Sequence, residues 1–452
     1  MSLNNLPVEW SVQKFEKVVY KIVGGGTPSK SNPEYYQGNI PWMSVKDMNK
    51  NILEDTVDHI TQDAIDNSAT NLIPKGTPII ATRMSLGKVV VAKFDSAINQ
   101  DLKAIFFGKY IDNNFFVYWY RSLAKLIESL GTGTTVKGIR LEVINNFDFP
   151  VVPLVEQQEI VRQLDVMLAQ VEQIKARLDA IPAILKKFRQ SVLADAVSGK
   201  LIEQNFSNLE FLKLESLILD FDNGISKRKG DSGSEVTVLR LADFKDAQRI
   251  FGNERSILLT EKELQKYKLL QNDILVVRVN GSVDIAGKFI LHKVNQNDET
   301  YCDHFIRLRI DLQKLLPEYL LYIANEGIGR DYLVNSLSTS AGQNTINQNS
   351  IKGLQLRIPE IRYQRVIVQT VEKLFKYSLK IEETVQSAQK RVNLLTQSIL
   401  AKAFSGELTA EWRMQHQDLI TGVNSAEALL AKIQSEREAS KPVKNTRKKK
   451  EV

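Results

Sequence analysis

The sequence has 452 residues, of which 43% are hydrophobic and 25% are charged, and its single cysteine is Cys302. These values are typical of globular proteins, and the length suits two or three domains. They exclude an internal disulfide, and no run of about eighteen apolar residues is present that would predict a membrane span.

The opening residues MSLNNLPVEW lack the basic and then apolar pattern of a signal peptide, so we expect a cytoplasmic location. The net charge is +7, but residues 441–452 (KPVKNTRKKKEV) contribute +5 of it and leave only about +2 for the rest. Such a tail fits either phosphate contact or a solvated end. Bulk charge therefore does not establish nucleic-acid binding.

Residues 1–152 are expected to form a first α+β domain. Apolar runs separated by glycine and proline predict a strand at residues 40–45 and a hairpin at residues 77–94 that turns at Gly87. An amphipathic stretch at residues 114–130 predicts one helix, which ends before Gly131.

Residues 153–205 are dominated by one long amphipathic helix. Its apolar positions are spaced four and three residues apart in alternation, the pattern of a helix that buries a narrow stripe against another helix. A second copy of this pattern occupies residues 359–412, displaced by 207 positions. The seam positions expected at the contact between the two helices are Ile160, Leu164, Met167, Val171, Ile174, Leu178, Ile367, Val371, Leu374, Ile381 and Val385.

Residues 206–358 repeat the order of the first domain. The run VTVLRLADF parallels IPWMSVKDM and places Asp243 opposite Asp47, and Gln364 lies opposite Gln157 at the start of the second helix. Residues 413–452 add a short helix, SAEALLAKIQSERE, and the basic tail. This duplication predicts an α+β fold with two globular domains related by pseudo-two-fold symmetry. The two long helices would form an intramolecular antiparallel coiled coil.

Fragments of enzyme motifs occur, but each lacks an essential part. GSVDIAGK at residues 281–288 has one residue too many between its glycines for a phosphate-binding loop, and Phe289 replaces the Ser or Thr that would hold magnesium. NPEY at residues 32–35 lacks the second proline of the Asn-Pro-Pro-Tyr element of amino-group DNA methyltransferases. The four histidines are scattered. We therefore expect no catalytic residue, no metal and no cofactor on this chain.

The duplicated architecture favours a reader of two DNA half-sites. A seam of about 33 residues makes a rod on the order of 50 Å long, which could hold two domains at half-sites on a duplex. Each correctly read base pair contributes roughly 1–3 kcal/mol of discrimination. Two domains that read three or four pairs each would reach the ~4–10 kcal/mol typical of specific binding.

Strings of residues near the start of the chain, in both helical regions and in the C-terminal part carry a resemblance to a known family. They are LPVEW, the helix entries PLVEQQEIV and PEIRYQRVIV, the run RVNLLTQSILAKAFSGELTAEWR and its continuation DLITGVNSAEALLAKI. Over essentially its full length, the sequence resembles the specificity subunits of type I restriction–modification systems, in the subgroup of the K-type enteric enzymes.

The resemblance implies two target-recognition domains, each of which reads one half of a bipartite, asymmetric site in double-stranded DNA. The helices would set the spacing and bind two modification subunits, which use S-adenosylmethionine to methylate adenine N6. Two restriction subunits would add translocation and cleavage that depend on ATP and magnesium. The chain itself would be a non-catalytic reader with no membrane partner.

Base recognition needs side chains that can form two hydrogen bonds with a base edge. The candidates are Lys46, Arg83, Asn99, Gln100 and Lys137 in the first domain and Arg240, Arg278, Asn280, Gln343 and Asn344 in the second. Each could instead be a surface or fold-stabilising residue. Asp47 and Asp243 recur in both domains, which favours a structural role.

Two other functions stay open on the sequence. A stand-alone adenine methyltransferase would methylate DNA without another subunit. A coiled-coil adaptor would never contact bases.

Overall fold

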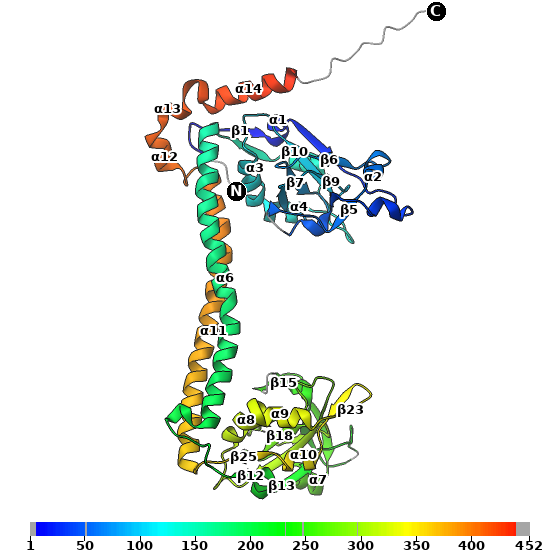
Figure 1. Cartoon of the computed structure of the whole chain (residues 1–452), viewed down its shortest axis with the longest axis vertical. Coiled ribbons are helices and arrows are strands. Elements are labelled where there is room, and N and C mark those ends of the chain that lie inside the picture. Colours follow the sequence, from blue (N-terminus) through cyan, green and yellow to red (C-terminus); the bar gives the residue numbers. More distant parts are fainter. Residues whose placement is uncertain (1–5, 50–51, 231, 246–247, 296, 440–452) are drawn as a thin grey trace, which may run out of the picture. The chain divides into compact units, whose positions relative to one another are not determined.

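The computed structural model describes residues 6–49, 52–230, 232–245, 248–295 and 297–439. The chain divides into two compact units, Met1–Leu178 with Ala388–Val452, and Asp179–Ser387 (Figure 1). Each unit holds one globular domain and part of both long helices. The basic tail at residues 441–452 lies outside the described residues. None of the described helices is both long and apolar enough for a membrane crossing.

The first unit is built on two sheets and a ribbon. The larger sheet has the strand order β2 (Lys21–Gly24), β10 (Leu102–Phe106), β7 (Pro78–Ala81), β8 (Val89–Ala92), β4 (Ile52–Leu53). The smaller has the order β5 (Asp58–Ile60), β3 (Ile40–Met43), β9 (Ser96–Ile98), β6 (Asn71–Ile73). The ribbon joins β1 (Ser11–Lys14) to β11 (Asp148–Val151). The predicted hairpin at residues 77–94 is β7 and β8.

The short helices of the first unit are α1 (Phe15–Val18), α2 (Gln62–Asp66), α3 (Asn113–Ser122), α4 (Ala124–Leu130), α5 (Leu141–Asn145), α12 (Ala410–Gln415), α13 (Gln417–Ile420) and α14 (Ala426–Ala439). Residues of α1, α3, α4, α5 and α14 belong to an aromatic core. The single helix predicted at residues 114–130 is divided at Leu123 into α3 and α4. In the core, Phe15 stacks on Trp119 with ring centroids 5.4 Å apart. Leu429 and Ile433 of α14 are buried in the same core.

The second unit repeats this plan. Its sheets have the orders β13 (Ile218–Asn223), β22 (Phe305–Ile310), β18 (Ile274–Val277), β20 (Phe289–Leu291), and β17 (Arg255–Leu259), β14 (Ser234–Leu239), β21 (Glu299–Tyr301). A ribbon joins β12 (Phe211–Lys213) to β25 (Gln355–Arg357). Its helices are α7 (Glu261–Tyr267), α8 (Pro317–Asn325), α9 (Gly327–Asn335) and α10 (Gln348–Lys352). Each unit has a parallel pair between equivalent strands, β3 with β9 and β14 with β21, which confirms the predicted duplication.

The long helices α6 (Leu154–Ser198) and α11 (Ile361–Phe404) run antiparallel and pack together within each unit. In the first unit, Leu164 shares a core with Leu400. In the second, Val192 shares a core with Val371. There the Arg189 guanidinium also donates to Ser378 Oγ at 3.0 Å and to Glu382 Oε2 at 2.8 Å.

The expected seam is only partly buried. The structure buries Ile160, Leu164, Val171, Ile367, Val371 and Val385, half-buries Leu178 and Leu374, and exposes Met167, Ile174 and Ile381. The reason is geometric, because two helices cover only a narrow line on each other. The alternate seam positions lie beside that line and face outward.

A buried glutamine fixes the start of each long helix to its domain. Gln157 Oε1 accepts a hydrogen bond from the Asp112 backbone N–H at 2.8 Å, and its Nε2 donates to the carbonyls of Tyr110 and Val152. Gln364 repeats the arrangement. It accepts from the Leu316 N–H at 2.8 Å and donates to the carbonyls of Lys314 and Pro359.

A second buried network occurs only in the first unit among the described residues. Glu156 Oε2 accepts from the Trp10 indole at 2.9 Å, and its Oε1 accepts from Thr409 Oγ1 at 2.7 Å and from Arg413 Nε at 2.9 Å. The network joins the N-terminal segment, the start of α6 and the chain after α11. The residue 207 positions after Glu156 is Tyr363, whose ring instead lies 6.4 Å from that of Phe206.

Replacing Gln157 with leucine tests the glutamine anchor. Leucine has a similar volume but leaves one buried N–H and two carbonyls unpaired, so the free energy of unfolding should fall by about 2–3 kcal/mol. Denaturant unfolding of the full chain measures this change. The exposed Gln170 of α6 is the control, and Gln170→Leu should change stability by less than about 0.5 kcal/mol. Equal effects of the two substitutions would contradict the anchoring role.

Candidate nucleic-acid interface

Three loops of the first unit meet at one edge of its larger sheet. The loop after β7 lies against the turn between β9 and β10, where the Thr82 N–H donates to the Asp101 carbonyl at 2.9 Å. It also lies against the loop at residues 131–138, where the Met84 N–H donates to the Lys137 carbonyl at 2.9 Å. The backbone therefore brings side chains from distant parts of the sequence to one place.

Three of the five candidates in the first domain come together at this edge. Arg83 and Lys137 are exposed on adjacent loops, and the Arg83 guanidinium lies 3.6 Å from the Asp101 carboxylate. Gln100 is exposed on the neighbouring turn, and its Oε1 accepts a hydrogen bond from the Thr27 hydroxyl. This group offers two cations and one amide to a ligand.

The other two candidates are engaged within the domain. Asn99 is buried, and its Oδ1 accepts from the Asp101 N–H at 3.1 Å. Lys46 is exposed, but its ammonium lies 2.9 Å from the Asp58 carboxylate, and this hydrogen bond raises the pKa of Lys46. Nearby Lys103 donates to the Gln100 carbonyl at 2.8 Å, and burial lowers its pKa.

The second unit builds the same edge around a small sheet. β19 (Val279–Asn280) pairs with β24 (Gln343–Thr345), which pairs with β23 (Ser338–Ser340). The Arg278 N–H donates to the His304 carbonyl at 2.7 Å, which attaches this sheet to the turn between β21 and β22. The candidates Arg278, Asn280, Gln343 and Asn344 are thereby brought together.

These four side chains differ in how far they are exposed and free to contact a ligand. Gln343 is exposed and Arg278 is half-buried. The half-buried Asn280 accepts from the Ser282 N–H at 2.8 Å, which closes a turn. Asn344 is buried, accepts from Thr339 Oγ1 at 2.8 Å and donates to the Gly281 carbonyl at 3.0 Å, so its amide holds the hairpin together.

The fifth candidate of the second domain, Arg240, caps a turn. Its Nη2 donates to Asp243 Oδ1 at 3.0 Å, and this hydrogen bond raises the pKa of Arg240. The buried Asp243 also accepts from the Arg240 N–H at 2.7 Å. Asp47 accepts from the Ser44 N–H at 2.8 Å in the equivalent turn of the first unit. Both aspartates therefore have the structural role that their recurrence predicted.

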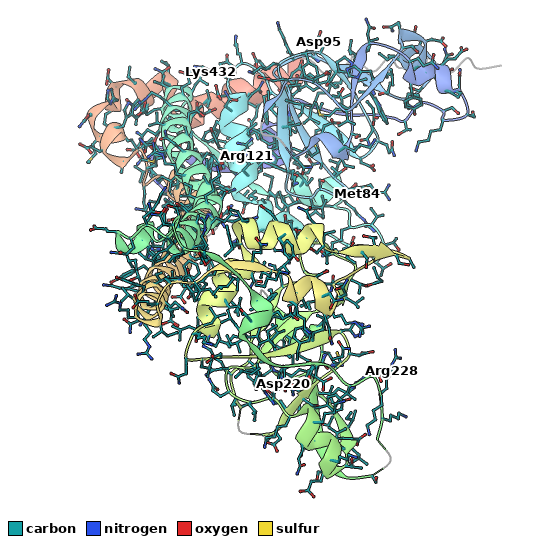
Figure 2. The ribbon with its side chains drawn as sticks, turned by 60° about the horizontal axis from the view of Figure 1, so that its bottom comes forward. Met84, Asp95, Arg121, Asp220, Arg228 and Lys432 are labelled. Carbon is teal, nitrogen blue, oxygen red and sulfur yellow. The ribbon has the colours of Figure 1, made fainter. Side chains whose placement is uncertain are left out.

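Sequence reasoning missed two features of the second edge. The first is the cationic run Lys227, Arg228 and Lys229, which follows Gly224 after β13. Arg228 and Lys229 are exposed, whereas Lys227 pairs with Glu263 (Figure 2 shows Arg228 at the outer edge of its unit). The charge run itself was the available signal. The second is the half-exposed His304, which occupies the turn equivalent to that of Gln100.

That turn also holds a compact group of potential metal ligands. Ligand atoms of Cys302, Asp303 and His304 lie within 4.8 Å of one another. The three residues are consecutive in the sequence, so chain connectivity alone brings their ligand atoms close together. We therefore assign no metal to this group.

The two edges have the same construction and both present cations and amides. Cations position a protein on the phosphate backbone, and amides and guanidinium groups read base edges. The class of protein that this arrangement defines is a duplicated DNA-recognition module joined by paired helices.

Comparison with known proteins gives the family. Residues 7–183 match the family described as Type I restriction modification DNA specificity domain. The chain is 53% identical over 348 residues to the type I restriction enzyme StySPI specificity subunit of Salmonella potsdam, covering 75% of each chain. It is 41% identical over 330 residues to the EcoKI specificity subunit of Escherichia coli strain K12, covering 72% of this chain and 71% of that one. The HsdS subunit of Thermoanaerobacter tengcongensis shares the fold, with a TM-score of 0.59 and 17% identity over 89% of this chain and 98% of that chain.

The chain belongs to the family of type I restriction enzyme specificity subunits, in its K-type group. The resemblance stated from the sequence is thereby confirmed. It is a non-catalytic DNA-recognition subunit of a restriction–modification complex, and no observation favours the methyltransferase or adaptor alternatives.

Arg83→Ala tests the first edge. If the guanidinium contacts a base, its loss should weaken specific DNA binding by roughly 1–3 kcal/mol and relax specificity in one half of the site only. Titration of the assembled complex with cognate and half-substituted duplexes measures both effects. Lys93→Ala is the matched control. Lys93 directly follows β8, whereas the Arg83 loop precedes this strand, so Lys93 lies at the other end of the strand, where it pairs with Glu54. An Arg83→Ala variant that binds like the control would exclude this contact.

Proposed function

We propose that this chain reads a bipartite, asymmetric DNA site, with one globular domain on each half. The observation that carries the proposal is the duplication of the loop edge, with Arg83 and Lys137 in one copy and Arg278 and Gln343 in the other. Because the side chains of the two copies differ, the two half-sites differ in sequence. The paired helices fix the length of the unread spacer between them.

The exposed sides of the paired helices support a docking role. Large apolar side chains remain exposed there, namely Val166, Met167, Ile174, Leu394 and Leu395 in the first unit and Ile184, Phe188, Tyr377, Leu379 and Ile381 in the second. Exposed apolar groups of this kind mark protein contacts. We assign these surfaces to two modification subunits, one for each unit.

The chemistry then resides in the partners. The modification subunits bind S-adenosylmethionine and methylate adenine N6, and two restriction subunits supply cleavage that depends on ATP and magnesium. We assign no cofactor site to this chain, and we propose a cytoplasmic location because its proposed DNA partner is found there.

Exchange of one domain tests the proposed division of labour. Residues 11–151, from β1 to β11, are replaced by the equivalent segment of a K-type relative. This exchange leaves Trp10 and Gln157 of the present chain in place. Methylated adenines are then mapped in a genome that expresses the hybrid chain and its modification subunit. One half of the methylated site should change while the other half and the spacer stay constant. A change in both halves would refute the assignment of one domain to each half.

A further inference from the structure

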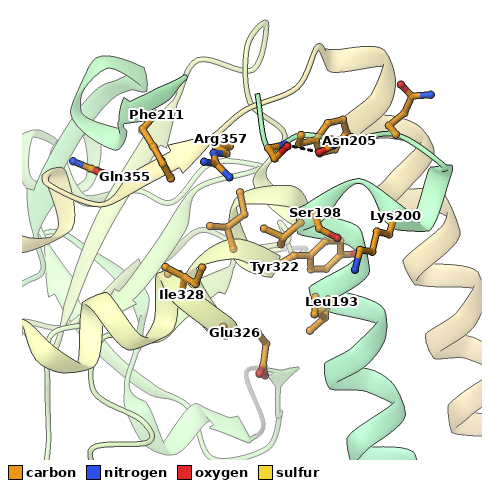
Figure 3. Close-up of a pocket in the computed structure, with 18 of the residues that line it drawn as sticks. Leu193, Ser198, Lys200, Asn205, Phe211, Tyr322, Glu326, Ile328, Gln355 and Arg357 are labelled. Atoms are coloured by element: carbon orange, nitrogen blue, oxygen red, sulfur yellow. Dashed lines mark hydrogen bonds between the residues drawn. The ribbon is translucent and has the colours of Figure 1, made fainter. Parts of the chain in front are cut away.

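A cavity of about 810 Å³ opens in the second unit beside the last turns of α6 (Figure 3). Its lining is mainly apolar and includes Leu193 and Val197 of α6 and Ile323 of α8. The aromatic ring of Phe211 and the side chain of Ile328 stand at its mouth, and Ile328 is 87% exposed. An open apolar hollow of this size is typical of a binding site.

The first unit carries larger side chains at two positions equivalent to lining residues of the cavity. Phe404 lies 207 positions after Val197, so the two residues are equivalent in the repeat. Trp119 is equivalent to Ile323, because the two residues lie at the same distance in sequence from the starts of α3 and α8. Both are buried, and the Phe404 ring lies 5.4 Å from that of Phe115. At these positions the first copy places two aromatic side chains, and the second places valine and isoleucine.

The rim of the cavity carries the cation Arg357. The Arg357 guanidinium stacks over the Phe211 ring at 4.3 Å. Its buried Nε has no hydrogen-bond partner among the described residues. Lys200 adds a second cation to the lining, opposed by Glu326 alone among the acids there. An occupant with a carboxylate beside its apolar part would pair with Arg357.

We propose that this cavity receives an aromatic side chain, flanked by a carboxylate, from a segment of the modification subunit. The aromatic side chain follows from the two aromatic residues at the equivalent positions of the first copy, and the carboxylate follows from Arg357. The subunit follows from position, because the cavity is built on α6, the helix that the proposed function assigns to modification-subunit docking. The inference therefore rests on that proposed function.

Val197→Phe tests the proposal by giving the second copy the residue of the first. The added ring occupies part of the cavity and buries more apolar surface, so thermal stability should be kept or raised, while affinity for the purified modification subunit should fall about tenfold or more through loss of an aromatic anchor. Titration calorimetry with the full chain measures the affinity. Val294→Phe is the matched control, because Val294 is exposed outside the cavity, and its affinity should equal that of the wild type.

Arg357→Gln is the second variant, which keeps the test open should Val197→Phe fold poorly. It leaves the cavity empty but removes the charge, and affinity should fall severalfold with a weaker dependence on salt. Wild-type affinity in both variants would overturn the proposal, as would a loss confined to the restriction subunit. A wild-type chain that forms no complex with the modification subunit would instead overturn the proposed function.

Discussion

The buried glutamine at the start of each long helix is the interaction on which the reading function depends. It pairs one backbone N–H and two carbonyls where the chain passes from β11 or β25 into the helix and where it enters α3 or α8. A buried amide with all these partners fixes the direction of the helix relative to its domain, because any rotation would leave polar groups unpaired. The loop edge of each unit is thereby held in a defined orientation to the helix that leaves it.

The duplication has diverged where the two copies have different neighbours. At Glu156 the first copy has a charged network that receives the N-terminal segment and the chain after α11, whereas Tyr363 in the second copy packs on Phe206. Burial of Glu156 is tolerated because Arg413, Thr409 and Trp10 all donate to it. The helix ends differ in the same way, since Phe404 closes the core of one copy and Val197 lines a cavity in the other.

Sequence predicted the fold better than the site, for a physical reason. Apolar spacing and repeated sequence strings report burial and duplication directly, so the two long helices, the repeated order of elements and the structural role of Asp47 and Asp243 followed from them. The polar candidates did not, because an amide used inside a hairpin, such as Asn344, looks the same in sequence as the exposed Gln343 beside it. The seam also shows this limit, since a heptad pattern cannot tell which apolar positions face the partner helix and which, like Met167, face outward.

The central claim is that one chain reads the two separated halves of a single DNA site. The most direct test is a map of methylated adenines in a genome that carries this chain and its modification subunit, compared with the same genome without the chain. The account predicts a single motif with two defined halves of unlike sequence, separated by a constant number of unspecified base pairs. A contiguous motif, or methylation that persists unchanged without the chain, would contradict it.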